Sequence, residues 1–155
     1  GQLEESSLVA RRLAPVRMMV CASPAYLEKH GTPTSPTDLS EHNCLNYSYH
    51  SERGRWTLKQ NGKTQTVEVN GTISANNGDA LRLAALADAG VILQPTFIVG
   101  KDIRAGRLQC VLPSYRVADF AVYAVYPHRQ YLSAKVRTFI DYLASYFGSP
   151  PYWDV

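Results

Sequence analysis

The chain has 155 residues, of which 45% are hydrophobic and 19% are charged, and 16 Lys and Arg against 13 Asp and Glu leave a formal net charge of +3. These values are ordinary for a soluble globular protein and exclude a disordered, collagen-like or coiled-coil chain. No stretch reaches the ~18 apolar residues of a membrane helix, and residues 1–5 show no signal-peptide pattern. The three cysteines, Cys21, Cys44 and Cys110, cannot all pair within one chain. We therefore expect reduced thiols and a cytoplasmic protein of one domain.

The first 50 residues predict short strands and a short helix. Ser23 is a good N-cap, Pro24 suits the first helical position, and Gly31 is a good stop, so a helix of about two turns lies between them. The apolar runs around it predict strands near 8–14 and 16–22, joined through Ala14-Pro15, then a loop with one helical turn, and a strand over 44–49.

Residues 56–69 predict a β-hairpin. Two strand-like segments flank Asn61-Gly62, and this dipeptide tolerates the positive φ angles of a tight two-residue turn. Trp56 then faces the same side as Leu58, where Val67 and Val69 can meet them.

The second half alternates helices and strands. Asn77 is a plausible N-cap for a helix over 78–89 that Gly90 ends, and 91–94 form a strand apolar enough to be buried on both faces. The apolar stripe predicted for the first helix is Ala80, Leu83, Ala84 and Ala87. The later elements are a helix over 96–105, strands over 108–112 and 118–126, and a helix that Ser133 caps, with the stripe Val136, Phe139, Ile140, Leu143 and Phe147.

This alternation, with one hairpin, predicts an α/β fold of three layers around a largely parallel sheet. In such sheets ligands bind beyond the carboxyl ends of the strands, where helix N-termini point. Two loops meet this description, 74–78 and 94–96.

Catalytic and metal-binding patterns do not emerge from the sequence. The phosphate-cradling, dinucleotide-binding, nucleophile-elbow and zinc-protease motifs do not occur, and no pair of acids can be singled out for acid–base work. His42 and Cys44 alone are a weak zinc signal, because structural zinc takes four ligands. The basic clusters Arg11-Arg12 and 53–55 are typical of solvated arginines rather than of a DNA-binding stripe. We therefore predict no cofactor, no metal and no catalytic residue.

The remaining candidates form a binding site without reactive groups. Asn76 and Asn77 precede a helix whose amides and dipole favour an anion. Gln94 ends a buried strand beside Pro95, where a polar side chain is costly unless it faces a cavity. Tyr47 and Ser48 end another strand and can offer hydroxyl and aromatic contacts.

Several segments together resemble the effector-binding domain of LysR-type transcriptional regulators, in an order and spacing that cover nearly the whole chain. They are Ala-Ser-Pro-Ala-Tyr-Leu at 22–27, Pro-Thr-Asp-Leu at 36–39, His-Asn-Cys-Leu at 42–45, Asn-Asn-Gly-Asp-Ala-Leu at 76–81, Gly-Val-Ile-Leu-Gln-Pro at 90–95, Gly-Arg-Leu-Gln-Cys-Val-Leu-Pro at 106–113, Tyr-Pro-His-Arg at 126–129 and the run over 132–141.

The resemblance implies a fold like the type 2 periplasmic binding proteins, in which two crossover strands join two lobes and a small effector, anionic or aromatic, sits in the cleft. Residues near 8–16 and 119–127 then look like the crossovers, and about 16–118 like a complete distal lobe. Residues 1–15 and 119–155 would be crossover strands and the remainder of a truncated proximal lobe. Carried over to this sequence, the effector-binding residues are Tyr47, Ser48, Asn76, Asn77, Gln94 and Pro95.

The sequence departs from the family in two respects, because it lacks the N-terminal winged helix-turn-helix and the first half of the effector domain. The helix over 133–147 thereby loses much of its expected sheet. We predict that Phe139, Ile140, Leu143 and Phe147 are exposed unless missing sequence or a second chain covers them.

The function predicted is effector sensing for a LysR-type transcription regulator. Effector binding would shift DNA contacts made by the absent domain within a homodimer or homotetramer, with the helix over 78–89 among the dimer contacts and no membrane partner. Three alternatives stay open. They are a solute-binding protein of a transporter, a small cleft enzyme, and a redox sensor of the same family with an exposed low-pKa cysteine.

Overall fold

The computed structural model describes residues 8–48, 54–117, 120–127 and 133–154, and the chain divides into two compact units. One unit comprises residues 17–118, and the other comprises residues 1–16 together with 119–155. No helix in the described part of the chain is both long and apolar enough to cross a membrane.

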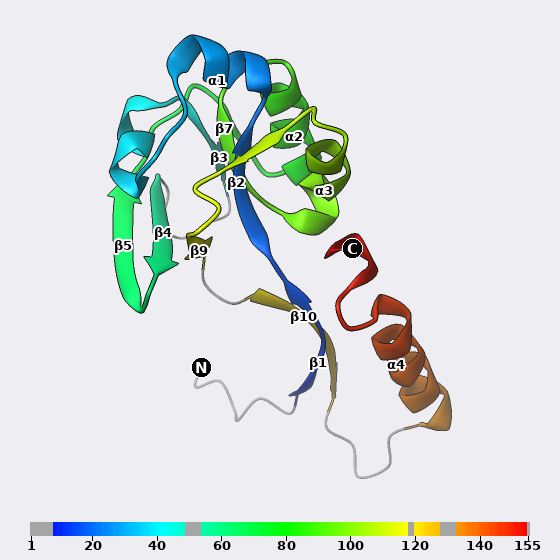
Figure 1. The fold of residues 1–155 in the computed structure, drawn as a ribbon. Helices are drawn as coiled ribbons and strands as arrows, with labels where there is room; N and C mark the ends of the chain where they lie inside the picture. The colour runs from blue at the N-terminus through cyan, green and yellow to red at the C-terminus, as the bar shows by residue number, and fades with distance from the viewer. Residues whose placement is uncertain (1–7, 49–53, 118–119, 128–132, 155) are drawn as a thin grey trace. The chain divides into compact units, whose positions relative to one another are not determined.

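A mixed sheet of five strands, in the order β6-β3-β7-β2-β8, forms the centre of the unit of residues 17–118. Figure 1 labels its three inner strands, β3, β7 and β2. Its strands are β2 (Met18–Ala22), β3 (Cys44–Tyr47), β6 (Ser74–Ala75), β7 (Val91–Pro95) and β8 (Gln109–Val111). β3 runs parallel to β6 and β7, whereas β2 runs antiparallel to β7 and β8. The predicted largely parallel sheet is therefore wrong for β2, because its partners β7 and β8 lie 70 or more residues away and no local pattern records their direction.

The two faces of this sheet carry separate cores, and alternate residues of one strand belong to different cores. Val20 and Val91 pack on the side of α1 (Pro24–His30), the 3-10 helix η1 (Pro36–Glu41) and the hairpin. Cys21 and Ile92 pack on the side of α2 (Gly78–Leu86) and α3 (Thr96–Arg104). The predicted three-layer arrangement is confirmed, with the sheet as the middle layer.

The predicted hairpin is also confirmed, as β4 (Arg55–Gln60) and β5 (Lys63–Glu68), which β9 (Arg116–Val117) extends to a second sheet. Asn61 and Gly62 have φ angles of 49° and 75°, as the tight turn requires. Trp56 lies opposite Val67, and both side chains are buried.

α2 is shorter than predicted and buries a different face. It ends at Leu86, because Asp88 adopts a left-handed conformation and the Ala89 amide donates to the Ala84 carbonyl. The buried residues are Leu81 and Ala85, which lie one turn apart. Leu83 is 58% exposed, so the predicted stripe of residues 80, 83, 84 and 87 is wrong. The small alanines on both sides of α2 left the periodicity ambiguous.

The second unit contains an antiparallel pair, β1 (Leu8–Val16) and β10 (Phe120–Pro127), followed by α4 (Ala134–Phe147) and η2 (Tyr152–Asp154). β1 continues through Pro15, since Pro15 pairs with Ala121 at a two-stranded edge, so the predicted break at Ala14-Pro15 lies two residues too early.

On α4 the predicted exposed stripe is correct only in part. Phe139 is 60% exposed, but Ile140 is buried and Leu143 and Phe147 are half-buried. Trp153 accounts for part of this burial, because its ring packs edge-on against Phe147 at a centroid distance of 5.3 Å.

Candidate functional site

The carboxyl ends of the three parallel strands β3, β6 and β7 meet at one edge of the five-stranded sheet. Tyr47 lies opposite Ala75, and the Ser48 amide donates to the Ala75 carbonyl at 2.9 Å. The ends of β3 and β6 therefore bring Ser48 next to the segment that contains Asn76 in sequence.

The end of β7 lies at the same edge. Leu45 pairs with Ile92 in parallel register, so two residues further along Tyr47 and Gln94 point to the same face, the one that α2 and α3 cover. Tyr47 is half-buried against that core, whereas Gln94 is only 3% exposed.

The first turn of α2 approaches Gln94 closely. A β-carbon built on Gly78 would stand 2.7 Å from Gln94 Oε1 and 2.6 Å from Ile98 Cδ1, so only glycine permits this contact without movement of a neighbour. The structure therefore brings the end of β7 and the start of α2 together, although 15 residues separate Gly78 from Gln94 in the chain.

Asn77 caps α2, as predicted. Its Oδ1 accepts from the amides of Asp79 at 2.8 Å and Ala80 at 3.2 Å. Asp79 adds a carboxylate to the same turn. Two donors of this terminus are thus already satisfied and an acidic side chain lies beside them, so α2 is less suited to an anion than its sequence predicted.

α3 begins differently. Its N-cap, Pro95, makes no side-chain capping bond, and its first turn contains no acid. Thr96 is 4% exposed, its amide donates to the Arg17 carbonyl at 2.9 Å, and its Oγ1 is buried with no hydrogen-bond partner among the described residues. Sequence reasoning placed Thr96 in the loop but not among the site residues; a hydroxyl directly after a buried strand was the available signal.

The six predicted residues differ in accessibility. Asn76 and Asn77 are exposed, Tyr47, Ser48 and Pro95 are half-buried, and Gln94 is buried. Asn76 and Asn77 are therefore open to solvent, while Gln94 is held beneath the first turn of α2.

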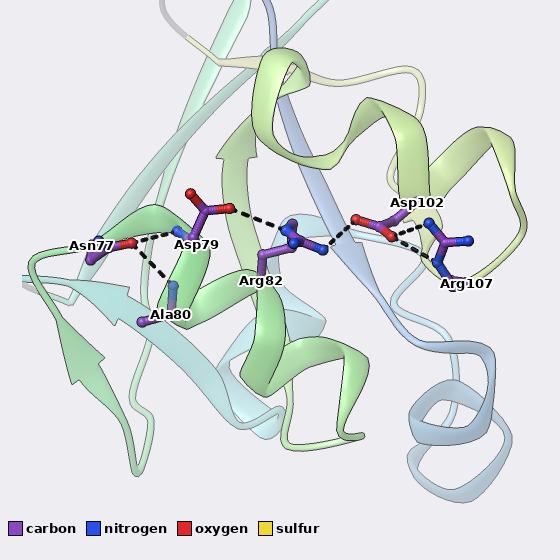
Figure 2. A network of polar contacts seen from close by, with 6 residues as sticks. All are labelled: Asn77, Asp79, Ala80, Arg82, Asp102 and Arg107. Atoms are coloured by element: carbon purple, nitrogen blue, oxygen red, sulfur yellow. Dashed lines mark hydrogen bonds and ion pairs between the residues drawn. The ribbon is translucent and has the colours of Figure 1, made fainter.

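An ion-pair network that includes Asp79, Arg82, Asp102 and Arg107 joins α2 to α3 (Figure 2). Arg82 donates through Nη1 to Asp102 Oδ2 at 2.9 Å and through Nε to Asp79 Oδ1 at 3.3 Å. Arg107 contacts Asp102 Oδ1 through Nε at 2.8 Å and Nη2 at 2.7 Å. Partial burial alone would lower the pKa of Arg82, but the hydrogen bonds and charges of Asp79 and Asp102 raise it above its ordinary value.

The cysteines do not match the redox-sensor alternative, which needs a lowered thiol pKa. Burial raises the pKa of Cys21 to about 12, with a smaller contribution from Cys110 opposite it on β8, and burial raises the pKa of Cys44 to about 12. Burial also raises the pKa of Cys110. Such thiols are mostly protonated at neutral pH and react slowly.

The weak zinc pair is engaged in local structure. Cys44 Sγ donates to the Leu39 carbonyl at 3.4 Å, and His42 Nδ1 lies 3.2 Å from the Tyr26 hydroxyl. Over the described ranges, no group of three or more His, Cys, Asp or Glu side chains could hold a metal ion.

Comparison with known proteins identifies the family to which this chain belongs. The family model described as LysR substrate binding domain matches residues 1–148. The chain is 37% identical over 147 residues to the uncharacterized HTH-type transcriptional regulator YhjC of Escherichia coli, covering 93% of the chain and 49% of that protein. It is 35% identical over 136 residues to an uncharacterized HTH-type regulator of Haemophilus influenzae, covering 88% and 47%. The chain thus spans about half the length of these relatives.

Solved structures of regulatory domains also match this chain. The regulatory domain of CrgA from Neisseria meningitidis matches with a TM-score of 0.79 and 30% identity, covering 94% of the chain and 72% of that domain. The regulatory domain of AphB in Vibrio vulnificus matches with a TM-score of 0.76 and 33% identity, over the same shares. The fold is therefore that of an effector-binding regulatory domain of LysR-type transcriptional regulators. The chain belongs to the LysR substrate-binding domain family.

Proposed function

We propose that this chain senses a small effector for a DNA-binding transcription regulator and catalyses no reaction. The observation that carries the proposal is Gln94, a polar side chain 3% exposed at the carboxyl edge of the sheet, beside the N-terminus of α2 and on the same face as Tyr47. Burying an amide is costly unless it is hydrogen-bonded, and polar groups placed at such an edge are typical of ligand recognition in α/β proteins.

The site proposed comprises Tyr47, Ser48, Asn76, Asn77, Gln94 and Pro95. Three strand ends and two helix starts supply these residues, so an effector bound there would contact several elements at once. Binding with different affinity to two conformations is the mechanism we propose, because a ligand shifts an equilibrium only through such a difference. The position of the effector between two lobes, which the resemblance implied, stays a prediction.

A thermal-shift screen of small carboxylic acids and aromatic compounds against the full-length regulator tests this proposal. A compound present at 100 times its Kd stabilises the folded state by about 2.7 kcal/mol. We expect Asn76→Ala and Gln94→Ala to reduce the shift caused by the best compound. Gln65→Ala, an exposed residue on β5, is the matched control and retains the shift. An unchanged shift in both site variants contradicts the assignment of the site, and measured turnover of the compound contradicts the proposed function.

We also propose that the full-length protein binds DNA through an N-terminal helix-turn-helix, acts in the cytoplasm and forms homodimers or homotetramers. Relatives about twice as long as this chain are HTH-type regulators, which supports the first point. Sedimentation of the full-length protein with and without DNA tests the oligomeric state, and a monomer under both conditions contradicts it.

Finally, we propose that the rest of the regulatory domain covers the apolar side chains exposed on α4. The regulatory domains of CrgA and AphB each extend beyond the 72% that this chain covers. The exposed set on α4 comprises Val136, Phe139, Tyr142 and Tyr146. An apolar patch of this kind is typical of a protein contact surface.

A further inference from the structure

One residue of the ion-pair network, Arg82, is not needed to neutralise the buried carboxylate of Asp102. Asp102 is 4% exposed, and a buried carboxylate needs a charged partner. Arg107 already provides one, since its Nε and Nη2 both contact Oδ1. Asp102 would therefore stay paired without Arg82, and the contacts of Arg82 need a different explanation.

Arg82 contacts both carboxylates of the network, Asp79 and Asp102. Its Nη1 reaches Asp102 on α3 and its Nε reaches Asp79 in the first turn of α2 (Figure 2). The Arg82 side chain is 25% exposed. The Asp79 amide in turn donates to the Asn77 cap. Arg82 thus ties the first turn of α2 to α3, and Arg107, 58% exposed and on the far side of Asp102, does not reach that turn.

Gly78, which lies next to Gln94, belongs to the helix turn that Arg82 links to α3. Gly78 lies between Asn77 and Asp79 in the chain, and it approaches both Gln94 Oε1 and Ile98 Cδ1 of α3. The space between the Gly78 backbone and these two side chains is too small for a β-carbon, so it depends on where α2 lies relative to β7 and α3. An anchor between the two helices limits movement of α2 relative to α3.

We propose that Arg82 is a positioning residue for the effector site, holding the segment Asn77-Gly78 against Gln94 by bridging Asp79 and Asp102. The inference rests on the assignment of Asn77 and Gln94 to that site. The proposed role requires that Arg82 contact both carboxylates, and a positive charge alone does not supply it. A lysine ammonium is a point charge that does not reproduce the two-armed contact of a guanidinium.

The test compares Arg82→Gln with Arg107→Gln in the 155-residue chain by nuclear magnetic resonance, without effector. Both variants remove one arginine from Asp102, so a role limited to pairing with Asp102 predicts the same outcome for both. We measure the protection factor of the Ala80 amide against hydrogen exchange and the side-chain amide peaks of Gln94.

We expect Arg82→Gln to lower Ala80 protection about three- to tenfold, as loss of a partly exposed hydrogen bond of ordinary strength predicts, and to shift the Gln94 side-chain peaks. Arg107→Gln should leave the Gln94 side-chain peaks unchanged. It should also leave Ala80 protection unchanged once any change in global stability is subtracted. Equal effects of the two variants, or unchanged Ala80 and Gln94 signals in Arg82→Gln, overturn the proposal.

Asp79→Asn provides the second variant if Arg82→Gln does not fold. Asp79 is 68% exposed, so this variant leaves the core and the Arg82–Asp102 contact in place. It should lower Ala80 protection and shift the Gln94 peaks in the same direction, and no change in either overturns the proposal. Because no effector is needed, failure here is distinguishable from failure of the proposed function, which the thermal-shift screen decides.

Discussion

Gly78 and Gln94 occupy adjoining space at the carboxyl edge of the sheet, since a β-carbon on Gly78 would stand 2.7 Å from Gln94 Oε1. One residue begins α2 and the other lies near the end of β7. The sequence predicted that the two loops 74–78 and 94–96 belong to one binding site, and this contact joins them.

Gly78→Ala should disturb this contact. Alanine is a better helix former than glycine, but its methyl group would overlap Gln94 and Ile98. We expect a net loss of about 1–2 kcal/mol in the free energy of unfolding, as for other overpacked positions, measured by urea denaturation. In a Gln94→Ala background the loss should be smaller, because one of the two obstructing side chains is shortened. Additive effects in this double-mutant cycle would contradict the contact.

Asp38 should stabilise the fold at neutral pH and not in acid. Its carboxylate accepts hydrogen bonds from the Ser35 hydroxyl at 2.7 Å and from the Thr34 amide at 2.8 Å, with further bonds from the Thr34 hydroxyl and the Ser35 amide. The Ser35 hydroxyl and these donors hold its pKa far below the ordinary value. Because the folded state depresses this pKa, the stabilisation is complete above the unfolded value of about 3.9. It is lost as the pH falls from there through the folded value.

Asp38→Asn checks this dependence. We expect a lower Tm than wild type at pH 7 and a difference that shrinks as the pH falls below about 4, followed by circular dichroism. Asp88→Asn, at an exposed position after α2, is the control for removal of a charge alone. A Tm difference between Asp38→Asn and wild type that stays constant from pH 7 to pH 2 would contradict the role of the Asp38 carboxylate charge in stabilising the fold.

The exposed apolar side chains of α4 should make the 155-residue chain bind a hydrophobic dye. Phe139, Tyr142 and Tyr146 are each more than half exposed. Dyes such as anilinonaphthalene sulfonate report exposed apolar surface. We expect dye fluorescence with this chain, less with Phe139→Ser/Tyr146→Ser, and little with the full-length regulator. Equal fluorescence per molecule from the chain and the full-length protein would contradict coverage by the rest of the regulatory domain.

The sequence by itself determined the features that depend on neighbours along the chain. Ser23 and Gly31 mark the ends of α1, and Asn61-Gly62 sets the hairpin turn. The capping role of Asn77 was also predictable, because its partners lie two and three residues away. Caps and tight turns follow from local φ and ψ preferences and short-range hydrogen bonds, which a sequence displays directly.

Tertiary structure decided the direction of β2, the buried face of α2 and the approach of Gly78 to Gln94. Cys21 pairs with Ile92 and Cys110, and Arg82 reaches Asp102 across 20 residues. Either face of α2 could pack, since alanines lie on both sides, and only contact with β3 and β7 selects Leu81 over Leu83. Burial and long-range pairing depend on which distant segment is adjacent in space, and the periodicity of one segment carries no record of its neighbour.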